Sequence, residues 1–282
     1  MIHHVAVHGL LRWIDPRRLL GPGDWTLDGK NASTNLTTHE AADLDARLRG
    51  IGLGGSALTV VCIPPLPRAA VRAARTTDAR RRRETTPGFT RAGTRLDDEG
   101  RWSLTPEALA LTLGQRAGGR PVIDAGCGAG GNAIGFARGG SKVTAIEQHP
   151  PRLADARHNA AVYGVASEIQ FVRGEAGSAL AAIHGSSVRN HGRDTILFVD
   201  PPWGRDWPRD RVRAADVPMV AAAIEWGHTY ADWIAEVWLK LPPSFDTSCF
   251  ADTTPEAWYG NARGDERRVK FLTVRVRSDA PM

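Results

Sequence analysis

The sequence predicts an α/β protein with a doubly wound parallel sheet, and three stretches carry this prediction. Residues 196–199 (ILFV) form an apolar run that is typical of a strand buried on both faces, and the run is stopped by an acid and two prolines. Residues 122–125 (VIDA) predict a second strand, which leads through a glycine-rich turn into a helix. Residues 142–146 predict a third strand that ends at an acid. Because open α/β sheets bind ligands at the carboxyl ends of their strands, these three ends mark the candidate site.

The end of the VIDA strand predicts a cofactor loop. Gly126 and Gly128 allow tight turns and a close approach of the backbone to a ligand. Asn132 follows at the start of the next helix, and a helix N-terminus favours a carboxylate such as the methionyl end of S-adenosylmethionine. Glu147 lies about 20 residues past the loop, the spacing at which an acid holds ribose hydroxyls. Glu175, after a strand at 169–173, is expected beside the adenine amino group.

The end of the ILFV strand predicts chemistry on a planar amine. The carboxylate of Asp200 and the carbonyl of Pro201, held rigid by Pro202, are suited to accept two amine hydrogens, while Trp203 stacks on the ring. The amine of a nucleobase is a weak nucleophile, so positioning supplies most of the rate. The alternative is a strand that ends in a proline turn over a core tryptophan. The cofactor loop upstream argues against this alternative, and the chemistry requires no metal.

Composition predicts a cytoplasmic protein without a membrane segment. The 282 residues are 42% hydrophobic and 24% charged, as in soluble globular proteins. No apolar run approaches the roughly 20 residues of a membrane helix, and no secretory leader is evident. Cys62, Cys127 and Cys249 are far apart, which argues against a disulfide framework and against a cysteine-rich zinc site.

The net charge of +5 comes from one segment. Residues 68–95 hold nine arginines and two acids, a net charge of +7, which leaves −2 for the remainder of the chain. Arg68, Arg72 and Arg75 follow one another at helical spacing and predict a basic helix face that binds RNA phosphates. Arg205 begins a second arginine-rich stretch, interpreted as a substrate loop. The alternative for the basic helix is a solvated surface without a binding partner.

The remaining segments predict a second, smaller domain and a connecting helix. Strands are expected at 5–7 and 57–63, and a helix is expected at 38–49 with Thr37 or Thr38 as its cap. Thr105-Pro106-Glu107 predicts a helix start with Thr105 as the cap and an end at Gly118. We therefore divide the chain into a small accessory domain (1–67), a basic helix and linker (68–95) and a catalytic domain (96–282).

Several motifs of the chain, taken in order, resemble those of the trimethylguanosine synthase family, the RNA cap guanine-N2 methyltransferases. They are LDDEGRWSLTPE (96–107), DAGCGAGGNAIGFA (124–137), AIEQHP (145–150) and DPPWG (200–204). The resemblance implies a class I, Rossmann-like fold of seven strands, S-adenosylmethionine as donor, and the N2 amine of guanine in RNA as acceptor. The site residues that it implies are Ser103, Thr105 and Pro106 near cofactor or substrate, Asp124 and Glu147 at the cofactor, and Trp203 on the base. The family usually has a serine where Asp200 stands.

The sequence therefore predicts an S-adenosylmethionine-dependent N-methyltransferase that acts on RNA. The acceptor that it favours is the N2 amine of guanine. Two alternatives stay open. In the first, the acceptor is a small-molecule amine or a free nucleotide, and the basic helix is only a solvated linker. In the second, the chain is a non-catalytic RNA-binding protein with a methyltransferase fold. The presence of Asp124, Glu147 and Asp200 together argues against the second alternative, because a binding module does not need all three.

Overall fold

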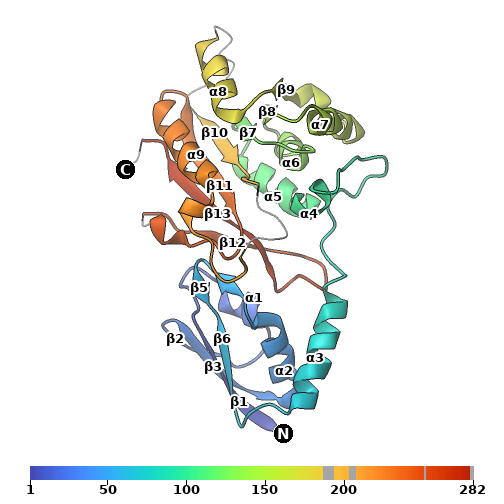
Figure 1. Cartoon of the computed structure of the whole chain (residues 1–282), viewed down its shortest axis with the longest axis vertical. Helices are drawn as coiled ribbons and strands as arrows, with labels where there is room; N and C mark the ends of the chain where they lie inside the picture. Colours follow the sequence, from blue (N-terminus) through green and yellow to red (C-terminus); the bar gives the residue numbers. More distant parts are fainter. Residues whose placement is uncertain (187–193, 203–207, 251, 280–282) are drawn as a thin grey trace. The chain divides into compact units, whose positions relative to one another are not determined.

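The computed structural model describes residues 1–186, 194–202, 208–250 and 252–279, and the chain forms two compact units (Figure 1). Unit 1 comprises Met1–Thr86, Trp207–Asp216 and Pro242–Leu272, and unit 2 comprises the rest. These units divide the chain differently from the boundaries at 67 and 95 that we predicted. Residues 68–86 belong to unit 1, and unit 1 also recruits two segments from the second half of the chain.

Unit 1 contains a four-stranded antiparallel sheet of order β2-β3-β1-β6. The strands of this sheet are β1 (Ile2–His8), β2 (Thr26–Asp28), β3 (Asn31–Thr37) and β6 (Thr59–Ile63). Its helices and smaller elements are α1 (Pro16–Leu20), α2 (Thr38–Leu48), α3 (Arg68–Arg81), the hairpin β4 (Gly52–Leu53) and β5 (Ser56–Ala57), and the short turns η2 (Ala214–Asp216) and η3 (Thr247–Cys249).

The alternating burial of residues on β1 and a capping box at the start of α2 explain the first half of unit 1. Val5 and Val7 on β1 point into the core, where they join Leu44 and Leu48 of α2. The helix α2 begins with a capping box, in which the Thr37 hydroxyl accepts from the backbone N–H of Glu40 and the Glu40 carboxylate accepts from the backbone N–H of Thr37. The predicted cap and helix are confirmed.

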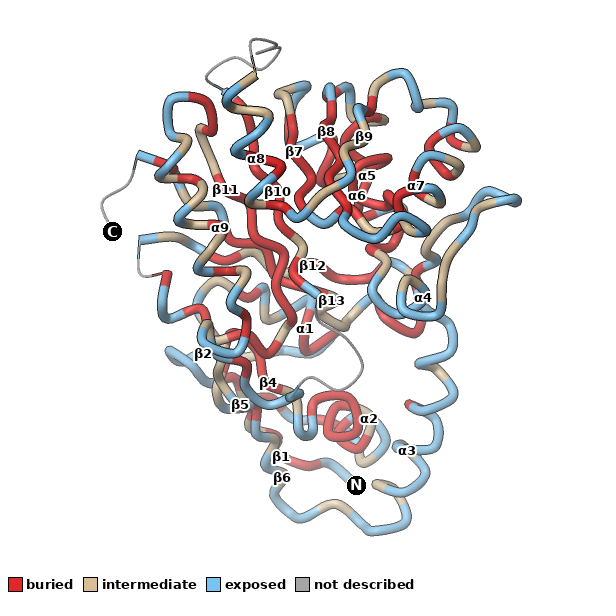
Figure 2. The backbone as a smooth tube through the Cα atoms, turned by 45° about the horizontal axis from the view of Figure 1, so that its top comes forward, coloured by how far each residue is buried: buried red, intermediate tan, exposed pale blue. Residues whose placement is uncertain are grey.

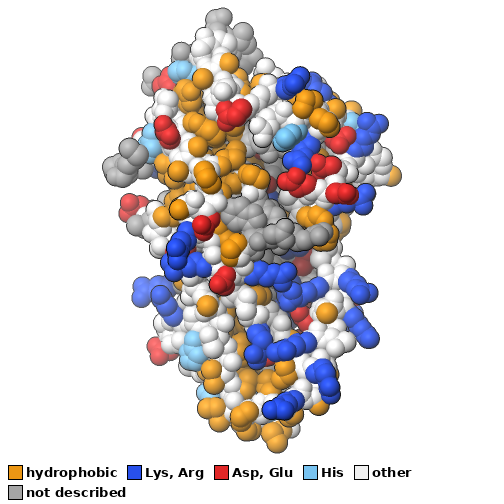
Figure 3. All heavy atoms as spheres, viewed as in Figure 1, with side chains coloured by type: hydrophobic (Ala, Val, Ile, Leu, Met, Phe, Trp, Pro, Cys, Tyr) orange, Lys and Arg blue, Asp and Glu red, His pale blue; other side chains and the backbone are white. Residues whose placement is uncertain are grey.

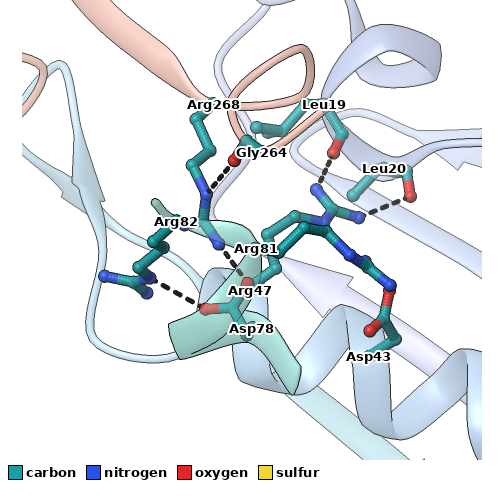
Figure 4. Close-up of polar contacts among 9 residues, drawn as sticks. All are labelled: Leu19, Leu20, Asp43, Arg47, Asp78, Arg81, Arg82, Gly264 and Arg268. Carbon is teal, nitrogen blue, oxygen red and sulfur yellow. Dashed lines mark hydrogen bonds and ion pairs between the residues drawn. The ribbon is translucent and has the colours of Figure 1, made fainter. Parts of the chain in front are cut away.

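The C-terminal half of α3 is held in unit 1 by charged side chains (Figure 4). Asp78 is buried and pairs with Arg82 at 2.8 Å and with Arg268. Arg81 pairs with Asp43 of α2 at 2.9 Å. These contacts explain why the basic helix belongs to a folded unit and is not a free linker: a buried carboxylate needs cationic partners, and one of them lies 190 residues away.

Unit 2 carries most of a seven-stranded sheet of order β12-β13-β11-β10-β7-β8-β9. The strands in chain order are β7 (Val122–Ala125), β8 (Val143–Glu147), β9 (Ile169–Arg173), β10 (Thr195–Val199), β11 (Ile234–Leu241), β12 (Glu256–Tyr259) and β13 (Val269–Arg277). The helices are α4 (Gly100–Ser103), α5 (Glu107–Ala117), α6 (Gly131–Arg138), α7 (Pro150–Val162), the turn η1 (Ala166–Glu168), α8 (Ala176–Gly185) and α9 (Pro218–Thr229).

The predicted doubly wound sheet of seven strands is confirmed. Strands β9, β8, β7, β10 and β11 are mutually parallel neighbours, and counted from β9 the strand order is third, second, first, fourth, fifth, seventh, sixth. The order reverses between β7 and β10, which creates a topological switch point. Every residue of β7, β8 and β10 is buried, as expected for strands covered on both faces (Figure 2).

The predicted start of helix α5 is wrong by one residue. The helix begins at Glu107, and Pro106 takes the cap position in place of Thr105. The backbone N–H of Glu107 donates instead to the carbonyls of Pro87 and Gly88, so no side-chain cap is needed. The predicted end is confirmed, because Gly118 adopts the left-handed conformation (φ 64°) that closes the helix.

Candidate active site

A cavity of about 550 Å³ lies in unit 2 at the carboxyl ends of the central strands. Its wall includes the loop after β7, Glu147 at the end of β8 and Asp200 after β10. Most of the predicted site residues line it: Ser103, Thr105, Gly126, Gly128, Asn132, Glu147, Glu175, Asp200, Pro201 and Pro202. The switch point of the sheet thus brings together residues that are up to 99 positions apart in the sequence.

The glycine loop and Glu147 form one side of the cavity. Gly126 (φ 86°) and Gly128 (φ 54°) have left-handed backbone conformations, and Gly128 faces open space where a side chain would project. Glu147 is 5% exposed, and its two oxygens accept from the backbone N–H groups of Gly128 at 2.9 Å and His149 at 2.8 Å. The carboxylate is therefore fixed in direction toward the loop.

Two buried polar atoms in the cavity wall lack hydrogen-bond partners among the described residues. They are the Thr105 hydroxyl and the Asn132 side-chain carbonyl. Buried polar atoms are normally satisfied, so these two fit a polar ligand. Together with the open glycine position and the fixed Glu147 carboxylate, they fit S-adenosylmethionine, whose ribose hydroxyls and amino-acid end need such partners.

Glu175 has a local structural role as well as a place in the cavity wall. Its carboxylate caps α8 by accepting from the backbone N–H groups of Gly177 at 3.0 Å and Ser178 at 2.9 Å. These hydrogen bonds lower the pKa of the carboxyl. Pro106, by contrast, is buried at the start of α5 and does not line the cavity.

Asp200 lies where the sequence predicts, directly after the fully buried β10. One of its oxygens, Oδ2, accepts from the side-chain amide of Asn132 at 3.1 Å and from the ammonium of Lys240 at 2.6 Å. Pro201 is buried and Pro202 exposed. Sequence reasoning missed Lys240, although a lysine within the apolar strand IAEVWLKL is a signal, since a buried ammonium requires a partner.

Asp124 is completely buried and does not line the cavity. Its carboxyl oxygens make no hydrogen bond of ordinary geometry with the described residues, although the backbone N–H of Ala133 acts to lower its pKa. Burial, followed by the negative charge of Asp200, raises the pKa of Asp124 to about 8, so the group is mostly protonated at neutral pH. The predicted contact of Asp124 with the cofactor stays a prediction.

An ion-pair cluster that the sequence did not reveal borders the cavity near α4. Arg152 of α7 donates to Asp97 at 2.7 Å and also pairs with Glu99. Burial alone would raise the pKa of Asp97, but its hydrogen bonds from Arg152 and from the backbone of Gly100 lower it. These ion pairs connect the segment that carries Ser103 and Thr105 to helix α7.

The other predicted site residues lie elsewhere. Arg68, Arg72 and Arg75 are exposed on α3 in unit 1 and are not part of this cavity. Trp203 and Arg205 lie outside the described residues. Within the described ranges, no group of three or more His, Cys, Asp and Glu side chains is placed to hold a metal ion. None of the helices described there is long and apolar enough to cross a membrane.

Comparison with known proteins supports the family resemblance. Residues 119–210 match the family described as RNA cap guanine-N2 methyltransferase. A trimethylguanosine synthase from Schizosaccharomyces pombe is 32% identical over 114 residues, which are 39% of this chain and 46% of that protein. The chain therefore covers less than half of that relative. The resemblance to this family is confirmed for the central part of unit 2.

Solved structures with a similar arrangement include an RNA methyltransferase and a predicted DNA methylase. An RNA methyltransferase from Salinibacter ruber, in complex with S-adenosyl-L-homocysteine, is 16% identical with a TM-score of 0.38, over 63% of this chain and 95% of that one. A predicted N6-adenine-specific DNA methylase from Listeria monocytogenes is 12% identical with a TM-score of 0.42, over 98% and 96%. The strand order, the glycine loop and the family match give unit 2 the class I methyltransferase fold, with S-adenosylmethionine as its cofactor.

Proposed function

We propose that this chain is an S-adenosylmethionine-dependent N-methyltransferase whose acceptor is an exocyclic amine in RNA, the N2 amine of guanine. The observation that carries the proposal is that Asp200, Pro201 and Pro202 line the same cavity as Gly128 and Glu147. An amine-binding edge and a cofactor loop therefore share one hollow, as methyl transfer between two bound molecules requires.

The chain's own residues supply binding and orientation. Glu147 would hold the ribose hydroxyls of the cofactor, and the open space at Gly128 would admit its amino-acid end. The Asp200 carboxylate and the Pro201 carbonyl accept the amine hydrogens, which aims the nitrogen lone pair into the cavity. When bound, the cofactor supplies a methyl group already activated by its sulfonium. The chain needs to align the amine and exclude water more than to provide a strong base.

RNA as the acceptor is supported by the family match and by the arginines of α3. Arg68, Arg72 and Arg75 are exposed, and their side chains make no hydrogen bond or ion pair within the described part of the chain. Figure 3, drawn from the same side as Figure 1, shows Lys and Arg side chains along the position of α3. Exposed cations without internal partners are available to phosphates.

The test is incubation of the protein with methyl-labelled S-adenosylmethionine and either total RNA or a small-molecule extract, followed by nucleoside analysis. We expect label in N2-methylated guanosine from RNA. Label only in small-molecule amines would replace RNA with a small acceptor. Binding of the cofactor without transfer to either pool would indicate a non-catalytic protein.

The cofactor part of the proposal is tested by Glu147→Ala. Calorimetric titration with S-adenosylhomocysteine should show a loss of about 1.5–3 kcal/mol, because a charge-assisted acceptor of the ribose hydroxyls is removed. Glu168→Ala is the matched control, since Glu168 pairs with Lys142 at 2.5 Å on η1 and is not part of the cavity. Equal affinity in wild type and Glu147→Ala would remove Glu147 from the cofactor site.

A further inference from the structure

Lys240 is a buried cation at the amine-binding edge of the cavity. Its side chain is 2% exposed, and its ammonium lies 2.6 Å from Oδ2 of Asp200, whose side chain is 16% exposed. Strands β10 and β11 are parallel, with Val199 paired to Leu239. Asp200 follows Val199 directly after the end of β10, and Lys240 follows Leu239 on β11. The register of the sheet therefore sets the two charges side by side.

Helix α6 covers the face of the sheet on which Asp200 and Lys240 lie, and it supplies the second donor to Asp200. Side chains two residues apart on a strand share a face, which groups Phe198 with Asp200 and Trp238 with Lys240. Phe136 of α6 packs on Phe198 at 5.0 Å and on Trp238 at 6.4 Å between ring centroids. Four residues earlier on α6, Asn132 reaches Asp200. An aromatic cluster thus anchors the helix whose amide, with Lys240, holds the carboxylate.

We propose that Lys240 is a positioning residue for methyl transfer: its ammonium fixes the direction of the Asp200 carboxylate toward the acceptor amine. This inference rests on the proposed function. Lys240 itself does not line the cavity, so it acts through Asp200 and does not touch the acceptor. Asn132, the second donor to the same oxygen, is uncharged and orients the carboxylate without neutralising it.

The charges around Asp200 explain why a cation is needed there. Glu147 on β8 is an acid of a nearby strand end, and the pKa of Asp124 on β7 is raised by burial and by the charge of Asp200. Without Lys240, the half-buried Asp200 carboxylate would lose the ammonium that compensates and orients it. Lys240 therefore holds the Asp200 carboxylate in an orientation in which it can accept an amine hydrogen.

The test compares Lys240→Met, Asp200→Asn and the double variant. Methyl transfer from labelled S-adenosylmethionine to total RNA is measured together with S-adenosylhomocysteine affinity and thermal unfolding. For Lys240→Met we expect a loss in kcat of at least about tenfold, because the Asp200 carboxylate loses the ammonium 2.6 Å from it, with cofactor affinity nearly unchanged. Asp200→Asn is neutral and keeps an acceptor oxygen, so adding it to Lys240→Met should restore a large part of the lost rate.

Lys142→Met is the matched control for Lys240→Met. Lys142→Met removes the lysine of an exposed ion pair, with a side chain 70% exposed, and should leave the rate unchanged. If wild type transfers methyl groups and Lys240→Met transfers them equally fast, the positioning role is wrong. If the double variant is no faster than Lys240→Met, the lysine is a structural residue, and the positioning role is again wrong. If wild type binds cofactor but transfers nothing, the proposed function itself fails, and the positioning role fails with it.

Discussion

The cavity of unit 2 and helix α3 of unit 1 both concentrate charge of one sign, but they differ in burial. Around the cavity, Glu147 is 5% exposed and the side chain of Asp200 is 16% exposed. On α3, Arg68, Arg72 and Arg75 are exposed to solvent. A buried charge is costly unless specific partners compensate it, whereas an exposed charge is screened by water and salt. We therefore expect large, residue-specific effects of substitution at the cavity and small, nearly interchangeable effects on the exposed arginines.

Helix α3 contains both exposed and buried charges. Its first half carries the exposed arginines, while its second half carries Asp78, whose side chain is 7% exposed and pairs with Arg82 and Arg268. Composition alone treats residues 68–84 as one basic run. The structure separates them into arginines available to a partner and arginines that hold the fold, so substitutions in the two halves test different properties.

The largest effect is expected for Asp200→Ala. Loss of the acceptor that orients the amine should reduce methyl transfer to RNA by about 10²–10³-fold, the range seen when one preorganised group is removed from an active site. Affinity for S-adenosylhomocysteine should stay nearly unchanged, since Asp200 is assigned to the acceptor. The measurement is single-turnover transfer of labelled methyl groups, and calorimetry measures the affinity.

Asp155→Ala is the control for this loss, because Asp155 lies on α7 and does not line the cavity. A rate equal to wild type in Asp200→Ala would show that the cavity acid is not part of the amine site. Burial would then have no functional consequence at this position, and the contrast with α3 would fail.

The next effect is a loss of stability in Asp78→Ala. Removal of this carboxylate leaves Arg268, whose pKa is lowered mainly by burial, without its anion, so the free energy of unfolding should fall by about 3 kcal/mol. Asp28→Ala, at an exposed position on β2, should change it by less than about 0.5 kcal/mol. Denaturant unfolding measures both, and equal values would remove the distinction between the halves of α3.

A smaller effect concerns the pH dependence of stability through Asp124. Burial and the charge of Asp200 raise the pKa of this carboxyl from 3.8 to about 8 in the folded protein. Its stabilising contribution is therefore complete below the unfolded pKa and is lost as the pH rises through about 8. The slope is at most about 1.4 kcal/mol for each pH unit.

Asp124→Asn cannot ionise and should remove this slope. In the cofactor-free protein, the unfolding free energy of Asp124→Asn relative to wild type should therefore increase from pH about 5 to pH about 8 and then level off. Parallel pH profiles of the two proteins would mean that Asp124 is ionised in the fold, and that burial does not control this site as we infer.

Much of the fold could be predicted because its strands carry strong local signals. The fully apolar β10 and the glycine stop at Gly118 are properties of short sequence windows. Strand β12 (Glu256–Tyr259) was missed because four residues give too little periodicity. The recruitment of residues 242–272 into unit 1 was missed because it depends on pairs such as Asp78 with Arg268, which no local pattern reveals.

The candidate site could be predicted in its backbone features and less in its electrostatics. Glycines, prolines and the spaced acid Glu147 follow from chain geometry, and the structure places them around one cavity. The partner of Asp200 could not be derived, because the pairing with Lys240 depends on which strand lies next to β10. The protonation of Asp124 likewise depends on burial, which the four letters VIDA do not fix.

The smallest effect per residue is expected on the exposed half of α3, and it shows whether those arginines meet RNA. Each phosphate contact on a single strand contributes about −0.7 to the slope of log K against log salt. Replacement of Arg68, Arg72 and Arg75 with glutamine should reduce the slope by about 2 if each makes one contact. Fluorescence anisotropy with a labelled single-stranded RNA at several salt concentrations measures this slope.

Arg12→Gln, a substitution of another exposed arginine of unit 1, is the control. Methylation of an isolated nucleoside should barely change in the triple variant, because these side chains lie outside the cavity. An unchanged slope would make the exposed half of α3 a solvated face.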